Sequence, residues 1–232
     1  MTMQDALTTG LPQLGLTLTQ QQTRQLCAFG EAVVEQNKVM NLTAITEPEQ
    51  VAKLHLLDSI SLLTVADLRG KRMIDVGCGA GFPGVPVKIA CPEVELTLLD
   101  SLGKRMNWLS LCLPGLGVEA RCITARAEEA VADRRESYDV ATSRAVARLN
   151  ILLELTAPYV KVGGQVLAMK GTAAKEELQE AQNAIKKLGL KLRELREFPV
   201  DDTAHTVLVF DKVAHTPPQY PRRYAKIKAQ PL

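Results

Sequence analysis

Short apolar runs alternate with stretches of helical spacing through the middle of the chain. Strands that alternate with helices predict an α/β domain built on a doubly wound, mostly parallel sheet. The expected strands are 73–76, 94–99, 118–124, 138–144, 165–169 and 205–211, and the expected helices between them are 101–113, 149–159 and 175–187. This pattern assigns residues 71–215 to one main domain.

The amino-terminal part of the chain has helical spacing and no strand pattern. Leu26, Phe29 and Val33 fall on one helical face, with Thr19 as the candidate N-cap and an expected end near Asn37. The first helix of this region is therefore expected to begin just after Thr19.

A second helix is expected to start at Thr46-Glu47-Pro48-Glu49, which matches a capping box with proline in the first turn, and to run to Leu63. Residues 1–18 are expected to form a loose start. A helical segment of this length is too short for an independent core. We therefore predict that residues 1–70 form a helical extension packed on the main domain, and that 216–232 form a basic tail.

The segment MIDVGCGAGFPGVPVKIACPEVELTLLD, residues 73–100, has the order strand, glycine loop, helix and strand. Gly77, Gly79 and Gly81 occupy every second position of the loop. Glycines at this spacing suit a turn that needs positive φ and close approach of the backbone to a ligand. Asp100 ends the second strand, where open α/β sheets bind their ligands.

Two nucleotide-type ligands are compatible with this loop. Residues 79–84, GAGFPG, match the dinucleotide fingerprint, whereas 75–81 match the D-x-G-x-G-x-G loop of S-adenosylmethionine (SAM) methyltransferases. Asp75 favours SAM, because a carboxylate beside the first glycine would repel a pyrophosphate at the helix N-terminus but attracts the ammonium of SAM. Asp100 would accept hydrogen bonds from ribose hydroxyls in either case. A methyltransferase is the leading interpretation, and a dehydrogenase is its main alternative.

Composition narrows the class of protein further. The 232 residues are 46% hydrophobic and carry a net charge of +2, which suffices for a packed core but does not by itself indicate a nucleic-acid partner. No apolar run approaches the ~18 residues of a membrane span, and no signal peptide is expected. The five cysteines are odd in number and lack C-x-x-C spacing, as is typical of reduced thiols in a cytoplasmic protein. No metal site is predicted.

His55 and Asp58 lie three residues apart on the second expected helix. The pair could face the cofactor cleft, or it could form an ordinary hydrogen bond on the helix surface. The second interpretation is favoured here, because polar pairs at this spacing are routine on helices.

Cations follow several of the expected strands. Strand-end loops of a parallel sheet gather at one rim, so phosphate contacts there would bring a polynucleotide to the cofactor. This placement favours a polynucleotide over a small-molecule acceptor. The rim cations are Lys104, Arg105, Arg126, Arg144 and Lys170, and Arg222, Arg223, Lys226 and Lys228 follow in the tail beside Tyr220 and Tyr224.

The loop after the fourth expected strand, ATSRAV, restricts the acceptor chemistry. It contains no cysteine for attack on a pyrimidine ring, and no Asn/Asp-Pro-Pro-aromatic motif for exocyclic amines. A ring nitrogen such as guanine N7 has an in-plane lone pair and no proton to lose. Its methylation needs in-line positioning and no general base, so a site without a dedicated base fits this acceptor.

Several longer motifs resemble one family, the RsmG (GidB, glucose-inhibited division protein B) family of bacterial 16S rRNA guanine-N7 methyltransferases. The likeness covers about residues 37–232. The motifs that carry it are NLTAI at 41–45, HLLDSI at 55–60, DVGCGAGFPGVPVKI at 75–89, LLDSLGKR at 98–105, RAEE at 126–129, SRAVA at 143–147, MKG at 169–171 and TPPQYPRR at 216–223.

The resemblance implies a seven-stranded, Rossmann-like sheet of the class I SAM-dependent methyltransferases. It implies methylation of N7 of one guanine in 16S rRNA near the decoding site, with S-adenosylhomocysteine as the second product. The substrate would be 16S rRNA, the 30S subunit or its precursor, and the protein is expected to be a monomer. An RNA-binding assembly factor that uses the nucleotide only structurally is the non-enzymatic alternative.

The resemblance also implies site residues. The cofactor would contact Gly77, Phe82, Asp100, Ala127, Glu128 and Arg144, and the loop pattern adds Asp75 and Gly79. RNA would be held by Lys104, Arg105, Arg126 and Lys170, and the placement of the tail cations adds Arg222 and Arg223. Arg144 is the candidate for positioning the reacting groups, and no general base is expected.

Overall fold

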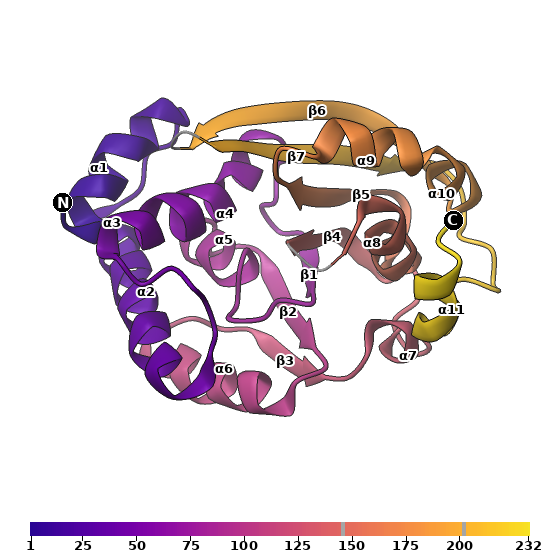
Figure 1. The fold of residues 1–232 in the computed structure, drawn as a ribbon. Helices are drawn as coiled ribbons and strands as arrows, with labels where there is room; N and C mark the ends of the chain where they lie inside the picture. Colours follow the sequence, from indigo (N-terminus) through magenta and orange to yellow (C-terminus); the bar gives the residue numbers. More distant parts are fainter. Residues whose placement is uncertain (145–146, 201–202) are drawn as a thin grey trace.

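A computed structural model describes residues 1–144, 147–200 and 203–232. Within these ranges a seven-stranded sheet runs through the centre of the molecule, with helices on both faces (Figure 1). The strands are β1 (Arg72–Val76), β2 (Glu95–Asp100), β3 (Arg121–Thr124), β4 (Tyr138–Arg144), β5 (Val160–Lys170), β6 (Leu190–Val200) and β7 (Thr203–Lys212).

The strand order is β3-β2-β1-β4-β5-β7-β6. Strands β1 to β5 pair in parallel, and β7 runs antiparallel to both β5 and β6. The order reverses between β1 and β4, so their carboxyl ends leave a crevice at a topological switch point. The predicted doubly wound, mostly parallel sheet is confirmed.

Both faces of the parallel strands are buried. Alternate residues of β1 serve opposite faces, since Met73 belongs to one apolar cluster whereas Ile74 and Val76 belong to another. A strand buried on both faces has few polar positions, which is why Asp75 stands out in this one.

Helices form the outer layers on the two faces of the sheet (Figure 1). The helices that precede β3 in the chain are α1 (Met3–Gln13), α2 (Gln20–Met40), α3 (Pro48–Val51), the π-helical η1 (Ala52–Leu57), α4 (Asp58–Ile60), the 3-10 helix η2 (Ser61–Thr64), α5 (Gly84–Ala90) and α6 (Gly103–Gly115). The remaining helices are α7 (Ala127–Ala130), α8 (Leu149–Thr156), η3 (Ala157–Tyr159), α9 (Ala174–Glu180), α10 (Gln182–Lys187) and α11 (Tyr224–Ala229).

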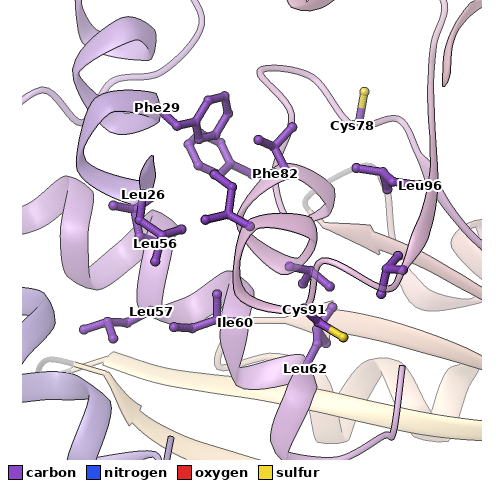
Figure 2. Close-up of a cluster of buried hydrophobic side chains, with 14 of the residues drawn as sticks. Leu26, Phe29, Leu56, Leu57, Ile60, Leu62, Cys78, Phe82, Cys91 and Leu96 are labelled. Atoms are coloured by element: carbon purple, nitrogen blue, oxygen red, sulfur yellow. The ribbon is translucent and has the colours of Figure 1, made fainter. Parts of the chain in front are cut away.

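The amino-terminal helices share a core with the sheet. Figure 2 shows side chains from α2, such as Phe29, packed beside Phe82 of the glycine loop. The two rings lie 5.3 Å apart between centroids. Leu56 and Ile60 of the second helical stretch belong to the same buried cluster. The helical region is therefore continuous with the core of the main domain.

The expected loose start at residues 1–18 is wrong, because this segment contains α1. Thr2 and Asp5 form a capping box at its start, and Leu7 and Leu11 are buried. Gly10 and Pro12 concealed the helical spacing. Gly10 has a packing role, since a Cβ at this position would lie 2.2 Å from Cδ1 of Leu57.

Two helix boundaries differ from the prediction. Thr19 is the N-cap of α2, as expected, but the helix continues to Met40. Asn37 instead accepts hydrogen bonds from two backbone amides of the following loop. The predicted capping box at Thr46 is wrong, because Glu47 is the N-cap of α3, Pro48 follows in the first turn, and the cap makes no side-chain hydrogen bond.

Strand β6 was not predicted from the sequence. It is an edge strand with alternating apolar and charged residues, but its pairing with β7 shifts register between Leu192 and Glu194. An irregularity of this kind breaks the period of two on which strand prediction depends. The expected helix at 175–187 is likewise interrupted, because α9 and α10 meet at Ala181.

Regular structure continues beyond Thr216, contrary to expectation. Helix α11 packs on α8 at the carboxyl-terminal side of the molecule (Figure 1). Ile227 is fully buried, and the Arg222 guanidinium forms a two-pronged ion pair with the fully buried Glu154 of α8. Internal contacts therefore order much of the expected basic tail.

Candidate active site

The main cleft lies at the carboxyl ends of β1, β2 and β4. Its volume is about 1070 Å³, against ~300–1,000 Å³ for most small-molecule pockets. The space therefore suffices for a nucleoside cofactor and part of an acceptor. Residues from every part of the chain line it, among them Thr43, His55, Asp58, Gly77, Gly79, Phe82, Asp100, Arg105, Arg126, Ala127, Glu128, Arg144, Lys170, His205 and Tyr224.

The glycine loop forms the floor of this cleft. Gly77, Gly79 and Gly81 all have positive φ, at 72°, 57° and 97°. The missing side chain at Gly79 leaves open space, since the nearest atom to an added Cβ would be Nη1 of Arg105 at 3.9 Å. Packing excludes a side chain at Gly81, because an added Cβ would lie 2.8 Å from Val85. The loop thus presents bare backbone to a ligand, as predicted.

Asp75 lies beneath the loop and does not line the cleft. Its side chain is fully buried, and its Oδ2 accepts a 2.8 Å hydrogen bond from the Gly84 amide at the start of α5. Oδ1 is buried without a hydrogen-bond partner among the described residues. Burial raises the pKa of Asp75 to about 7, against the opposing effects of the Gly84 amide and Arg144.

This arrangement disfavours a dinucleotide. A pyrophosphate would need the amides at the start of α5, and the carboxylate of Asp75 already occupies Gly84 there. A carboxylate with one unpartnered oxygen fits a cationic group above the loop instead.

Asp100 lies at the edge of the cleft at the end of β2. Its Oδ2 accepts from the Gly79 amide at 3.0 Å and its Oδ1 from the Leu102 amide at 2.8 Å. Each carboxylate oxygen has a second lone pair, so both can still accept a hydrogen bond from a ligand hydroxyl. Asp100 therefore fits a ribose, while it also fixes the glycine loop.

Arg144, at the end of β4, is held by the amino-terminal helices. Its Nη1 donates to the Leu54 carbonyl at 2.9 Å and to Asp58 Oδ2 at 3.0 Å, and its Nη2 lies 3.2 Å from His55 Nδ1. The guanidinium carbon lies 5.0 Å from the centroid of the Phe82 ring. The Arg144 side chain is 17% exposed and faces the cleft.

His55 is neutral in this network. Its Nδ1 lies 3.2 Å from Arg144 Nη2, which can only donate, and 3.1 Å from the Leu54 carbonyl oxygen, which can only accept, while its Nε2 lies 2.8 Å from the Thr43 hydroxyl, which can do either. Burial and the Arg144 guanidinium lower the pKa of His55 to about 4. The His55 ring also stacks on Phe82 at 4.7 Å between centroids. The favoured interpretation of His55 and Asp58 as a helix-surface pair is therefore wrong, because both are buried and line the cleft.

The predicted RNA-binding residues fall into two groups. Lys104 is exposed at the start of α6, Arg105 and Arg126 line the cleft, and Arg223 is exposed in the carboxyl-terminal segment. These four cations can reach a ligand from solvent.

Lys170 and Arg222 are instead paired within the protein. Lys170 forms a 2.7 Å ion pair with Glu177 and donates to the Ala147 carbonyl, and its side chain is 8% exposed. Arg222 is paired with Glu154. Their charges are neutralised by internal carboxylates, so we leave both out of the RNA surface.

Sequence reasoning missed Thr43, His205 and Tyr224 as residues of the cleft. NLTAI, which contains Thr43, was a signal in the resemblance but carried no stated role. His205 was placed only at the start of a strand. Tyr224 was noted beside the tail cations, and its position in the cleft depends on the docking of α11.

Residues 1–144, 147–200 and 203–232 contain neither a candidate membrane-spanning helix nor a candidate metal-binding cluster. No helix there combines the length and apolar character needed to cross a bilayer. No cluster of three or more His, Cys, Asp or Glu side chains there could hold a metal ion.

The fold and the cleft define a class of protein. A SAM-dependent methyltransferase from Aquifex aeolicus superimposes with a TM-score of 0.55 at 16% identity, covering 71% of this chain and 93% of that one. The TYW2 protein of M. jannaschii, solved in complex with AdoMet, gives a TM-score of 0.53 at 12% identity over 64% and 72% of the two chains. The fold is that of the class I SAM-dependent methyltransferases.

The sequence comparisons identify the family. Residues 22–204 match the model of the GidB family, rRNA small subunit methyltransferase G. A ribosomal RNA small subunit methyltransferase G from Alkaliphilus metalliredigens is 44% identical over 229 residues, 96% of each chain. The corresponding protein of Alkaliphilus oremlandii is 43% identical over 238 residues and the full length of both. The chain belongs to the rRNA small subunit methyltransferase G family.

Proposed function

We propose that this protein transfers a methyl group from SAM to N7 of one guanine in 16S rRNA, near the decoding site of the small ribosomal subunit. The observation that carries the proposal is the cleft, where a glycine-lined floor beside Asp100 lies below a rim of accessible cations. The names of the relatives support an rRNA substrate. The proposed setting is the cytoplasm, where ribosomes are found, and the proposed active form is a monomer.

The residues of the cleft fit the cofactor. Gly77 and Gly79 would let its nucleoside approach the backbone, Asp100 would accept from its ribose, and Ala127 and Glu128 would lie beside its adenine. SAM supplies an electrophilic methyl group on a sulfonium. Asp75 contributes a negative potential from below the loop, and Phe82 and Arg144 bound the opposite wall.

The acceptor needs orientation rather than deprotonation. Guanine N7 carries a lone pair and no proton, so transfer depends on a near in-line approach. His55 is neutral, but its Nδ1 faces Arg144 and the Leu54 carbonyl, and its Nε2 faces the Thr43 hydroxyl. Neither ring nitrogen is therefore placed to accept a proton from an acceptor, as expected of a site without a general base.

The cations at the rim give the proposed route for RNA. Lys104, Arg105 and Arg126 lie at the carboxyl ends of β2 and β3, and Arg223 lies near Tyr224 on the other side of the cleft. Phosphate contacts from these residues would hold a folded loop while one base enters the cleft. We also propose that residues 1–70 and 71–215 act as one catalytic unit, because His55 and Asp58 line the same cleft as Asp100.

The decisive experiment maps N7-methylguanine in 16S rRNA from 30S particles incubated with the protein and SAM. One new N7-methylguanine in 16S rRNA is expected, and none with heat-inactivated protein. Transfer to another atom or to a small molecule would overturn the acceptor. SAM binding without any transfer would favour the assembly-factor alternative.

The cofactor is tested separately by calorimetry. Asp100→Ala is expected to weaken binding of S-adenosylhomocysteine by about 1–3 kcal/mol, the scale of lost hydrogen bonds to a charged group. Binding of NAD in place of S-adenosylhomocysteine would instead support the dehydrogenase.

A further inference from the structure

The amino-terminal helices supply a socket for the Arg144 guanidinium, and its carboxylate, Asp58, is not among the predicted site residues. Asp58, the residue that follows η1, provides the carboxylate of this socket. Arg144 and Asp58 are 86 positions apart in the sequence. Asp58 is buried, with its side chain 7% exposed, and Arg144 is partly buried, with its side chain 17% exposed.

The π-helical turn shapes the socket. In an α-helix the amide of Asp58 would donate to the carbonyl of Leu54, four residues earlier. Here it donates to the carbonyls of Lys53 and His55. The Leu54 carbonyl accepts from Arg144 Nη1, and Asp58 accepts from the same nitrogen. Single π-turns inside helices often mark functional sites.

Asp58 is itself fixed from a second direction. Its Oδ1 accepts from His205 Nδ1 at 2.8 Å, while its Oδ2 accepts from Arg144. His205 lies near the start of β7. The carboxylate is thus held between two strands of the sheet, and its orientation is determined before any substrate binds.

The donors of the guanidinium can be counted. A guanidinium has five N–H groups. Both Nη1 hydrogens are used by Leu54 and Asp58, and one Nη2 hydrogen points to His55 Nδ1, which also lies 3.1 Å from the Leu54 carbonyl oxygen. The second Nη2–H and the Nε–H have no acceptor within residues 1–144, 147–200 and 203–232, and the side chain lines the cleft.

We infer that Asp58 is a positioning residue for methyl transfer, which holds Arg144 so that its two remaining N–H donors face an oxygen of a bound substrate. This inference rests on the proposed function. The oxygen belongs either to the carboxylate of the cofactor or to the carbonyl of the acceptor base. Adenine has an amino donor at position 6, where guanine has a carbonyl acceptor. Contact of Arg144 with the acceptor base would therefore also select guanine over adenine.

The test is a double-mutant cycle on Asp58→Ala and Arg144→Ala, measured as kcat and KM on 30S particles well below the Tm of each variant. Asp58→Ala is expected to lower kcat/KM by about 100-fold, the scale of a misplaced catalytic geometry. The double variant is expected to be no slower than Arg144→Ala alone, within about twofold. The inference would be overturned if the losses of kcat/KM in the two single variants multiplied in the double variant. It would also be overturned if Asp58→Ala had unchanged activity per folded molecule.

A conservative variant keeps the test decisive if Asp58→Ala folds poorly. The side-chain carbonyl of Asp58→Asn can still accept from Arg144, and His205 can present Nδ1 as an acceptor in its other tautomer. This variant is expected to recover at least about tenfold of the activity lost in Asp58→Ala. If the activity of Asp58→Asn were no higher than that of Arg144→Ala, the result would contradict a role of Asp58 in positioning Arg144.

Binding of S-adenosylhomocysteine distinguishes the two substrate oxygens. A raised Kd in Asp58→Ala and Arg144→Ala assigns the donors to the cofactor, and an unchanged Kd with a raised KM or lowered kcat assigns them to the acceptor. Glu136→Ala removes a partly buried carboxylate from the opposite end of the sheet and should leave both quantities unchanged. An inactive wild-type protein would refute the proposed function itself, whereas a normal Asp58→Ala would refute only this inference.

Discussion

Two carboxylates at opposite ends of the sheet, the buried Asp58 and the partly buried Glu136, are each bonded to one cation and one histidine. Asp58 is shared between Arg144 and His205, and Glu136 is shared between Lys212 and His215. His205 and Lys212 even belong to the same strand, β7, near its two ends. Since the chemistry is nearly identical, the difference between the clusters lies in where each is placed.

The Asp58 cluster lies at the carboxyl ends of the parallel strands and leaves donors of Arg144 in the cleft. In the Glu136 cluster, Lys212 is fully buried and donates to Glu136 at 2.9 Å and to the Val160 carbonyl at 3.2 Å. The Thr216 amide also donates to Glu136, at 2.8 Å. This cluster ties the segment after β7 to the body of the protein. Similar bonds thus support ligand binding at one end of the sheet and stability at the other.

The largest expected difference comes from removing each cation. Arg144→Met should lower the rate of methyl transfer to 30S particles by about 100- to 1,000-fold, as for loss of a preorganised donor. Lys212→Met should leave the rate per folded molecule within about twofold of wild type. Initial rates at saturating SAM provide the measurement. Comparable losses of rate in both variants would abolish the distinction between the clusters.

Stability should show the opposite order. Lys212→Met removes the fully buried member of the ion pair, leaves the partly buried Glu136 without its lysine, and should cost about 3 kcal/mol of unfolding free energy. For a chain of this size that lowers the Tm by roughly 10 °C. Adding Glu136→Gln should restore part of the loss, because the charge left without its lysine is gone. Urea denaturation of the single and double variants checks this, and a fully additive double variant would contradict it.

A tetrapeptide that occurs twice in the chain allows a comparison with a smaller expected effect and a control of the same sequence. Gly-Lys-Arg-Met occurs at 70–73, before and within β1, and again at 103–106, where α6 begins beside the cleft. Replacing Lys104 and Arg105 by alanine should weaken rRNA binding by about tenfold at low salt and reduce the slope of log K against log salt by about 1.5.

The same double substitution at Lys71 and Arg72 removes the same charge from the other end of the sheet. It should leave the salt slope unchanged. Equal effects of the two double variants would mean that RNA binding follows net charge and has no preferred face.

The sequence predicted what depends on local order. Gly77, Gly79 and Asp100 could be placed because strand, loop and strand follow one another along the chain. Thr19 could be placed as an N-cap for the same reason. Cleft residues with distant partners could not be placed from the sequence. The role of Asp58 depends on Arg144, 86 positions away, and a polar pair at i and i+3 is compatible with a position in the cleft or on the helix surface.

The same reason explains why the internal partners of two cations could not be predicted. Arg222 lies in a run of basic residues, and its partner Glu154 is 68 positions earlier within an apolar helix. A cation near a strand end, such as Lys170, is equally ambiguous until Glu177 is folded against it. Charge patterns identify the face that can bind RNA, but tertiary contacts decide which cations remain accessible.

The smallest expected effect concerns acid stability and belongs to the Glu136 cluster. Burial works to raise the pKa of this carboxyl, but hydrogen bonds from Lys212, His215 and the Thr216 amide outweigh it and lower the pKa to about 2. In the unfolded chain a glutamate takes up its proton near pH ~4.3. The unfolded state therefore binds more protons below that pH, and stability must fall as the pH falls.

Between pH 5 and pH 3.5 this single group should remove about 1 kcal/mol from the free energy of unfolding. Glu136→Gln has no proton to take up, so its stability curve should be flatter over this range by the same amount, although it starts lower at pH 7. Urea denaturation of both proteins at a series of pH values measures the difference. Parallel curves would mean that Glu136 is not ionised more readily in the folded protein than in the unfolded chain, and the stabilising role of this cluster would then rest on packing alone.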